Sequence, residues 1–421
     1  MTTTDARPKT LNRWLRRHSL TLVAALGGAA GVAYAATRPA DVTTSSTTTT
    51  VSIVKQTEPE PPKPLHEAEP PRDTVQDTVQ IALLLDTSSS MDGLINQARS
   101  HLWSMVDQMG KMTRVVNGKT RGVKIELALY EYGNDTLPAT SGFIRQVQPF
   151  TGDLDKVSEK LHALFTNGGS EFVGQAIEVA ANKLQWSSNP DTMKFIFVAG
   201  NEEFDQGPVT ALQAMKAAAG KGVNVQLIYC GPKDQTWANA ASIAKTDLVT
   251  IDQNHVAAYI PAPQDQQILA LGNELNTTYM AYGAEGAASF ARQSSADMSS
   301  AKMSPKVAIE RMQLKGKRAY DNRSWDVVDA ITNDGKFLEN TPDDKLPAEL
   351  RGKSLEEKKQ IVDARIAKRN AIKAQIAKLE AERTKFLEAE QAKQKGEAVN
   401  SLETELMKTT KKIATQKGYK L

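Results

Sequence analysis

A nearly continuous apolar run from Val79 to Leu85 constrains the fold of this chain more than any other feature. A strand that is apolar at successive positions buries both of its faces, which is typical of the inner strands of a parallel sheet. Similar runs follow at 123–130, 194–198, 223–230 and 248–251. The chain therefore contains several candidate strands for one buried sheet.

Patterns with helical spacing lie between these strands. They occupy residues 95–109, 154–165, 173–184, 209–220 and 236–244. Alternation of strand and helix predicts an α/β fold, with a doubly wound, mostly parallel sheet flanked by helices. We assign this domain to residues 75–282, and we expect its ligand crevice at the carboxyl ends of the strands.

The first apolar run ends in Asp86-Thr87-Ser88-Ser89-Ser90, a DxSxS pattern. A tight turn at this point would aim one carboxylate and two hydroxyls into the same space. Hard oxygen ligands of this kind suit Mg²⁺. The turn resembles the start of the metal-ion-dependent adhesion site in the von Willebrand factor A (VWA) family, and the resemblance covers about half of the chain.

The resemblance implies two further ligand loops. In the string Thr166-Asn167-Gly168-Gly169-Ser170-Glu171, Ser170 takes the position of the family's threonine, and Thr166 is a weaker candidate. The third loop departs from the family, because Gly200 stands where the family has aspartate. Asn201 or Glu202 could supply oxygen instead, and Glu202 reaches farther. The implied Mg²⁺ ligands are Asp86, Ser88, Ser90, Ser170 and Glu202.

The same resemblance implies a non-enzymatic binding module that captures a protein ligand through an acidic side chain, which completes the metal's coordination. The string AGNEEFDQGP at 199–208 resembles a bacterial envelope subset of the family. The alternative is a metal-free scaffold that assembles through its C-terminal helices. A metal-dependent hydrolase is disfavoured, since His162, His255 and Cys230 lie in no catalytic motif.

The amino terminus has the pattern of a secretory signal. Basic residues precede an uncharged run at 19–36, and Ala33-Tyr34-Ala35 fits a cleavage site. Residues 1–36 are therefore expected to be a signal peptide or an uncleaved membrane anchor. The Thr- and Pro-rich stretch 37–74 is expected to be a linker. The chain would then be exported to the periplasm or cell envelope, with a possible attachment to the membrane.

Composition excludes two further classes of protein. The chain has one cysteine, Cys230, which rules out an intramolecular disulfide framework and multi-cysteine metal sites. Residues 37–344 carry 37 acidic and 28 basic side chains. This negative balance argues against nucleic acid as a partner, because phosphate contacts need clustered cations.

The last third of the chain has a helical composition. Residues 283–345 are expected to be a helical extension that docks on the VWA domain through Trp325 and its neighbours. Residues 346–421 predict a long amphipathic helix or coiled coil, a break near Gly396 and a second, shorter helix. Arg369 and Arg383 fall in the apolar seam, so self-association should be weak. An intramolecular hairpin is the alternative.

Overall fold

The computed structural model describes residues 76–254, 259–393 and 402–420. The contacts of the chain divide it into Met1–Leu65 and His66–Leu421, and every described residue lies in the second unit. The predicted signal or anchor (1–36), the linker (37–74), His255 and the break near Gly396 fall outside the described residues. Among the described helices, none combines the length and the hydropathy that a membrane crossing requires.

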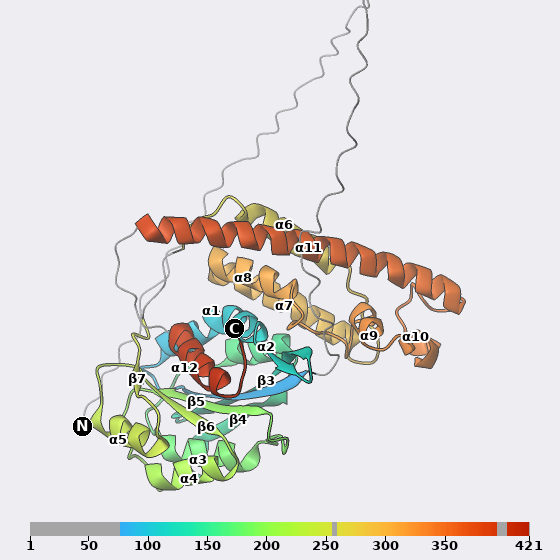
Figure 1. Ribbon diagram of the computed structural model, residues 1–421. Coiled ribbons are helices and arrows are strands. Elements are labelled where there is room, and N and C mark those ends of the chain that lie inside the picture. Colours follow the sequence, from blue (N-terminus) through green and yellow to red (C-terminus); the bar gives the residue numbers. More distant parts are fainter. Residues whose placement is uncertain (1–75, 255–258, 394–401, 421) are drawn as a thin grey trace, which may run out of the picture. The chain divides into compact units, whose positions relative to one another are not determined.

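Within the described residues the core of the structure is one seven-stranded sheet (Figure 1). The strand order is β2 (Thr113–Val116), β3 (Lys119–Tyr132), β1 (Asp77–Asp86), β5 (Met193–Gly200), β6 (Asn224–Tyr229) and β7 (Val249–Thr250), with β4 (Ile144–Thr151) paired to β3. β1 is parallel to both β3 and β5, and β5, β6 and β7 continue the parallel series. β2 and β4 run antiparallel to β3. The predicted fold class, a mostly parallel sheet flanked by helices, is confirmed.

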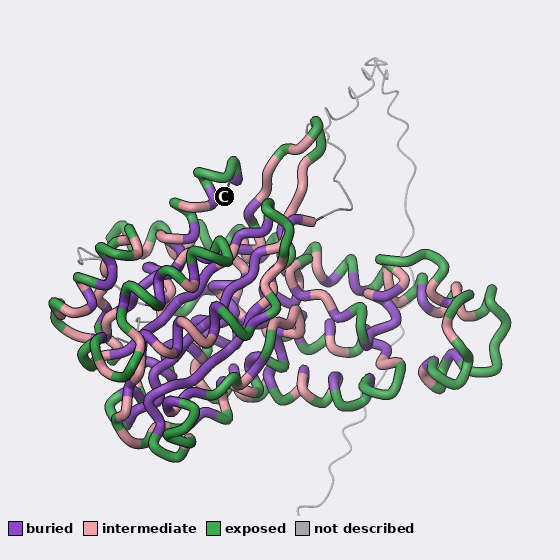
Figure 2. Tube along the Cα trace, turned by 90° about the horizontal axis from the view of Figure 1, so that it is seen from below, coloured by how far each residue is buried: buried purple, intermediate pink, exposed green. Residues whose placement is uncertain are grey.

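Helices cover both faces of the sheet. Successive side chains of β1 point to opposite faces and are apolar on both, so each face needs a covering layer. Leu83 and Leu85 point into one core with α1 (Asp92–Gly110) and α2 (Leu154–Ala163). Leu84, on the other face, joins a second core. That second core is formed with α3 (Val173–Lys183), α4 (Ala211–Gly220) and α5 (Gln235–Ala244). Figure 2 shows the strands as the most continuously buried part of the chain.

The remaining helices pack on the α1 side of the sheet. They are α6 (Asp265–Asn276), α7 (Gly286–Met303), α8 (Pro305–Lys315), α9 (Val327–Asn333), α10 (Phe337–Asn340), α11 (Leu355–Lys393) and α12 (Leu402–Gln416). Ile309 of α8, Ile376 of α11 and Leu406 of α12 belong to the same apolar core as α1. Residues of α6, α7, α8, α11 and α12 therefore share a core with the sheet, whereas α9 and α10 form a separate apolar cluster with Val362 of α11.

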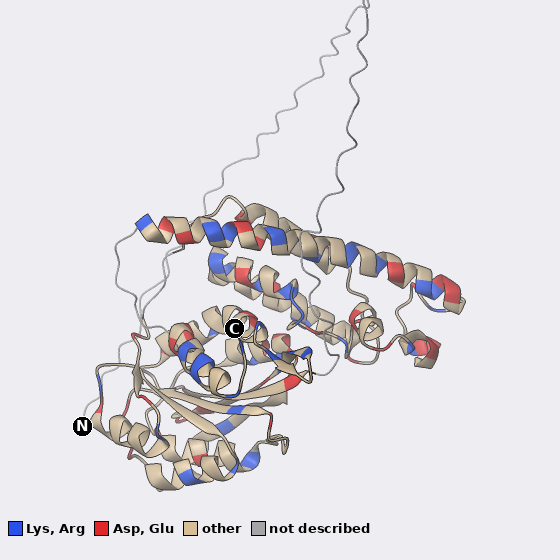
Figure 3. Cartoon of the chain, viewed as in Figure 1, with Lys and Arg blue, Asp and Glu red and all other residues tan. Residues whose placement is uncertain are grey.

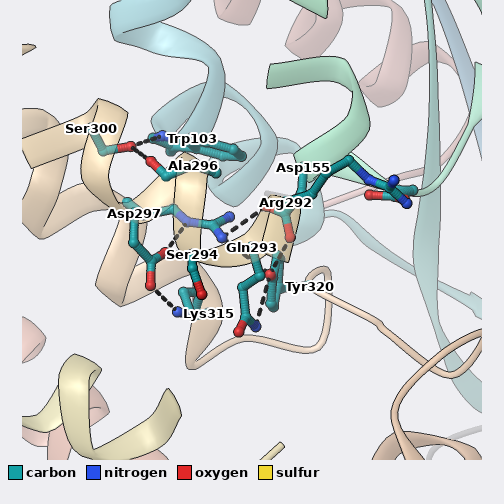
Figure 4. Close-up of polar contacts among 12 residues, drawn as sticks. Trp103, Asp155, Arg292, Gln293, Ser294, Ala296, Asp297, Ser300, Lys315 and Tyr320 are labelled. Atoms are coloured by element: carbon teal, nitrogen blue, oxygen red, sulfur yellow. Dashed lines mark hydrogen bonds and ion pairs between the residues drawn. The ribbon is translucent and has the colours of Figure 1, made fainter. Parts of the chain in front are cut away.

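A buried charge network joins this helical region to α1 and α2 (Figure 4). The Arg311 guanidinium is fully buried, 2.7 Å from Asp155 Oδ1 and 2.9 Å from Asp297 Oδ1. It also lies over the Trp103 ring, 4.4 Å from its centroid. Lys315 pairs with Asp297 at 2.7 Å, and burial lowers the pKa of this lysine to about 8. Each buried cation thus has a carboxylate on a neighbouring helix.

The contacts of the long helix α11 differ from those of the coiled coil that its apolar seam suggests. Its buried side chains, Val362, Arg369, Ile372, Ile376, Leu379 and Arg383, contact this chain's own helices, mainly α6 and also α8, α9 and α10. Acidic and basic residues follow one another along α11 (Figure 3). The second helix, α12, packs against α1, where Glu403 lies 2.9 Å from His101. The apolar seam of α11, from which self-association was expected, is therefore covered by helices of the same chain.

Arg369 explains why a charged residue stands in that seam. Its guanidinium lies 2.6 Å from Asp326 Oδ2 and 2.7 Å from Asp329 Oδ1. It also donates to the Thr278 carbonyl oxygen at 2.7 Å and stacks over the Tyr279 ring. A buried arginine with two carboxylates and a carbonyl is satisfied inside a fold, and it would be costly at an open helix–helix seam.

We predict that Arg369→Ala lowers the free energy of unfolding by about 3–5 kcal/mol, because it leaves the buried Asp326 carboxylate without its cation. Lys368→Ala is the control, since Lys368 is 46% exposed and should change stability by about 0.5 kcal/mol or less. Urea denaturation followed by circular dichroism measures both. Equal effects of the two substitutions would contradict the prediction.

Candidate metal centre

Three loops meet at the carboxyl ends of β1 and β5. The register pairs Asp86 with Tyr132 of β3, and Leu85 with Ala199 of β5, so the loops after β1 and β5 start side by side. The loop between α2 and α3 joins them through two backbone hydrogen bonds. Asn167 N donates to Thr87 O at 2.9 Å, and Ser89 N donates to Gly168 O at 3.0 Å.

The first loop brings together three predicted ligands. Asp86 is fully buried, and its Oδ1 accepts a hydrogen bond from Ser88 N at 2.7 Å. Ser88 Oγ and Ser90 Oγ lie 3.3 Å apart. Ser90 is exposed and accepts a hydrogen bond from Asn201 Nδ2 at 2.9 Å. One carboxylate and two hydroxyls thus lie on a single turn.

The second loop gives its two sequence candidates, Ser170 and Thr166, different partners. Ser170 forms an isolated β-bridge with Gly133, which follows β3, and a Cβ atom on Gly133 would lie 2.7 Å from Asp86 Oδ1. Thr166 Oγ1 donates to Asp92 Oδ1 at 2.7 Å, which engages the weaker candidate at the start of α1. Ser170 therefore stays beside the centre, whereas Thr166 serves to fix its own loop.

Glu171 is the residue that the sequence interpretation missed. It follows Ser170 directly, its side chain is buried, and a Cβ atom on Gly133 would lie 2.8 Å from Glu171 Cγ and 2.7 Å from Asp86 Oδ1, which places the two acidic side chains side by side. Burial raises the pKa of Asp86 to about 6. Burial, together with the negative charge of Asp86, raises the pKa of Glu171 to about 9. The feature of the sequence that could have indicated Glu171 is an acidic residue directly after the string Gly168-Gly169-Ser170.

The third loop has no carboxylate pointing into the centre from position 200. Tyr132 takes that space, and its hydroxyl donates to the Ala199 carbonyl oxygen at 2.9 Å. A Cβ atom on Gly200 would lie 2.4 Å from Tyr132 Oη, which is too close for an unchanged aspartate there. Glu202 is exposed, and its carbonyl oxygen accepts a hydrogen bond from Trp237 Nε1 at 2.6 Å. Its side chain therefore lies at the rim.

The donor set fits a hard divalent cation. Asp86 Oδ2 and Glu171 Oε2 are buried, and neither has a hydrogen-bond donor among the described residues. Ser88 and Ser90 add neutral oxygens next to them. The described residues contain no group of three or more histidine, cysteine, aspartate or glutamate side chains arranged to hold a metal. A cation here would be held by two carboxyls and hydroxyls together.

The two other sequence candidates for chemistry lie elsewhere. Cys230 follows β6 directly as a buried thiol, and burial raises its pKa well above the usual value. His162 Nδ1 lies 2.8 Å from the Ser158 carbonyl oxygen on α2, and burial lowers its pKa. A raised thiol pKa disfavours the thiolate that nucleophilic catalysis needs.

Comparison with known proteins agrees with this architecture. Residues 80–259 match the family model of the von Willebrand factor type A domain, so this part of the chain is similar to a VWA domain. No curated protein matches the chain.

Solved structures with detectable similarity are distant from this chain. Proximal thread matrix protein 1 from the mussel byssus, with a zinc-occupied MIDAS motif, is 13% identical over 42% of this chain and 42% of that one, with a TM-score of 0.32. A von Willebrand factor type A protein from Catenulispora acidiphila is 16% identical over 42% and 39%, with a TM-score of 0.32. The SpRpn10 VWA domain is 18% identical over 44% and 100%, with a TM-score of 0.29. The chain thus spans about two fifths of the mussel protein.

We predict that the metal-free protein loses stability as pH rises from about 4.5 to 9. Asp86 and Glu171 both have folded-state pKa values above their ordinary values of 3.8 and 4.5. Stability is therefore fully present below those ordinary values and is lost as pH rises through the folded-state pKa values. Glu171→Gln cannot ionise, so it should flatten this dependence and stabilise the protein at pH 7.5 by on the order of 2 kcal/mol.

Urea denaturation in the presence of a chelator measures these free energies across the pH range. Glu178→Gln, on helix α3, is the control and should follow the wild type. A Glu171→Gln variant with the wild-type pH dependence would contradict the shared burial of the two carboxyls.

Proposed function

We propose that this chain is a non-enzymatic binding module of the cell envelope, which captures a protein partner through a divalent cation held by its VWA domain. The observation that carries the proposal is the buried Asp86 carboxylate, whose Oδ2 has no donor among the described residues while Ser88 and Ser90 lie beside it. A buried carboxylate without a partner is costly, and a bound cation would remove that cost.

Mg²⁺ is the cation that this donor set favours, since carboxylate and hydroxyl oxygens are hard ligands. Asp86, Ser88 and Ser90 would hold it from the first loop, with Ser170 beside them on the second loop. Glu202 would contribute only if its exposed side chain turned inward. When bound, the cation supplies a coordination position for a carboxylate oxygen of the partner.

The charged residues on the surface around the centre indicate which kind of partner it would bind. The described parts of the loops at the carboxyl ends of the strands carry Lys233 as their one basic residue. Their exposed or half-buried acidic residues are Asp92, Asp135, Glu202, Glu203, Asp205, Asp234 and Asp252. A strongly acidic ligand would be repelled by this rim. The rim favours a partner segment that surrounds its coordinating carboxylate with lysine or arginine.

Phe165 adds an apolar contact to this surface. Its side chain is 58% exposed, on the same loop as Ser170 and Glu171. Its carbonyl oxygen accepts a hydrogen bond from Asn134 Nδ2 at 3.0 Å, which fixes the backbone below the ring. Exposed aromatic side chains at interfaces commonly contribute much of the binding free energy. We therefore expect the partner to cover Phe165.

The alternative function is a metal-free scaffold that assembles through the C-terminal helices. Tyr132, which fills the space beside Gly200, is the observation that favours it. The buried seam of α11 speaks against assembly through that helix, because its apolar residues are already covered. The response to a chelator separates the two functions, since a metal-free scaffold would be indifferent to it.

We predict that the protein binds Mg²⁺ with a dissociation constant on the order of 10⁻⁴–10⁻³ M, the range of weak extracellular Ca²⁺ sites. Asp86→Ala should abolish binding, because it removes the buried negative charge. Ser90→Ala should only weaken it, since water can replace a neutral ligand. Isothermal titration with Mg²⁺ and Mn²⁺ measures the constants, and pull-downs with and without chelator test the partner. Absence of saturable binding at millimolar metal would refute the adhesion site.

We predict that residues 1–36 direct export, since a basic start, an apolar run and a cleavage pattern occur in the order of a secretory signal. A reporter that is active only outside the cytoplasm, fused after residue 74, measures this. The matched control replaces Arg13, Arg16 and Arg17 with glutamate and should lower the reporter signal. A reporter that remains inactive behind the native sequence would contradict the envelope location.

A further inference from the structure

We propose that Glu171 is the second carboxylate ligand of the cation and takes the place of the third-loop aspartate that this chain lacks. The proposal rests on the proposed metal-dependent function and assigns a role to a residue outside the sequence-predicted ligand set. In this arrangement the second loop, and not the loop after β5, supplies the second negative charge.

The first argument is the space that the fold makes for both carboxyls. Asp86 is 0% exposed and Glu171 is 2% exposed, although they come from different loops. Both press on Gly133, where a Cβ atom would lie 2.7 Å from Asp86 Oδ1 and 2.8 Å from Glu171 Cγ. Gly133 also has a positive φ of 81°. Glycine at this position thus permits the two acidic groups to approach each other.

The second argument is the charge balance of the buried acidic residues. The described structure contains eight of them. Six form an ion pair with arginine or lysine: Asp77, Glu131, Asp155, Asp265, Asp326 and Glu405. The two others, Asp86 and Glu171, have no lysine or arginine pair among the described residues and lie together. A divalent cation would pair with both carboxylates once they are ionised, and buried charges usually require such a partner.

The third argument is the exclusion of a carboxylate from position 200. Tyr132 Oη is held by the Ala199 carbonyl oxygen, and it fills the space that an aspartate Cβ at Gly200 would enter. The Cβ position of residue 200 lies 3.3 Å from Asp86 Oδ2, which shows that this space borders the same carboxylate. Tyr132 therefore blocks one route for a second acidic ligand, and Glu171 approaches Asp86 by another.

The test compares the metal affinity of four full-length proteins by isothermal titration with Mn²⁺ and Mg²⁺. Glu171→Gln should raise the dissociation constant at least tenfold, and Glu178→Gln, on α3, should leave it unchanged. Glu202→Gln examines the competing ligand and should cause a smaller loss than Glu171→Gln. Wild-type affinity in Glu171→Gln would overturn the assignment while leaving metal binding itself intact. Absence of binding in the wild type would overturn both the assignment and the proposed function.

A compensating variant separates a ligand from a residue that only supports the fold. Tyr132→Phe with Gly200→Asp removes the blocking hydroxyl and moves a carboxylate to the third loop. Combined with Glu171→Gln, it should recover at least part of the lost affinity. Thermal unfolding in chelator is measured in parallel, because Glu171→Gln should be no less stable than the wild type. The ligand role would be contradicted if Glu171→Gln lost both affinity and stability, and if the added Gly200→Asp substitution did not restore the affinity.

Discussion

β1 lies between two parallel neighbours, and most of the structure follows from this pairing. Every residue of Asp77–Asp86 is paired with β3, and Val79–Leu85 is also paired with β5. Both edges of β1 are consequently paired, and its apolar side chains point to both faces of the sheet, so each face needs a helical layer. Its carboxyl end opens where the neighbouring loops begin, and the last residue, Asp86, is buried by them. One strand therefore determines both the layers of the fold and the position of the site.

This dependence explains which parts of the fold the sequence could predict. The apolar run 79–85 has a buried environment on both sides, so its composition alone indicates an inner parallel strand. β2 and β4 were missed because they pair only with β3 and carry many polar residues, as in the string IRQVQPFT of β4. A strand with one solvated side lacks a continuous apolar pattern, and turn residues such as Gly118 give only a local indication of the hairpin.

The C-terminal helices show a different limit of prediction. Helix at 355–393 follows from composition and spacing, but the partner of its apolar seam does not. Arg369 was interpreted as a residue that weakens a coiled coil, whereas its guanidinium binds Asp326, more than forty positions earlier in the chain. A single sequence contains the charge of both residues and no information on their distance. An arginine in an apolar seam is therefore also an indication of a buried carboxylate elsewhere in the same chain.

The same distinction between local and distant information applies to the metal centre. Asp86, Ser88 and Ser90 lie within five positions, so their convergence follows from one turn. The relation of Glu171, Tyr132 and Gly200 depends on three segments that meet only after folding. Elsewhere in the described structure, each buried carboxylate has a cation supplied by this chain, as Arg311 and Arg369 illustrate. Asp86 and Glu171 are buried without such a cation, at the carboxyl end of β1 and close to the exposed Ser90, where we propose that a metal ion from solvent takes that place. The proposed cation would thus serve the one buried acidic pair that the described part of the chain leaves without lysine or arginine, next to the exposed Ser90.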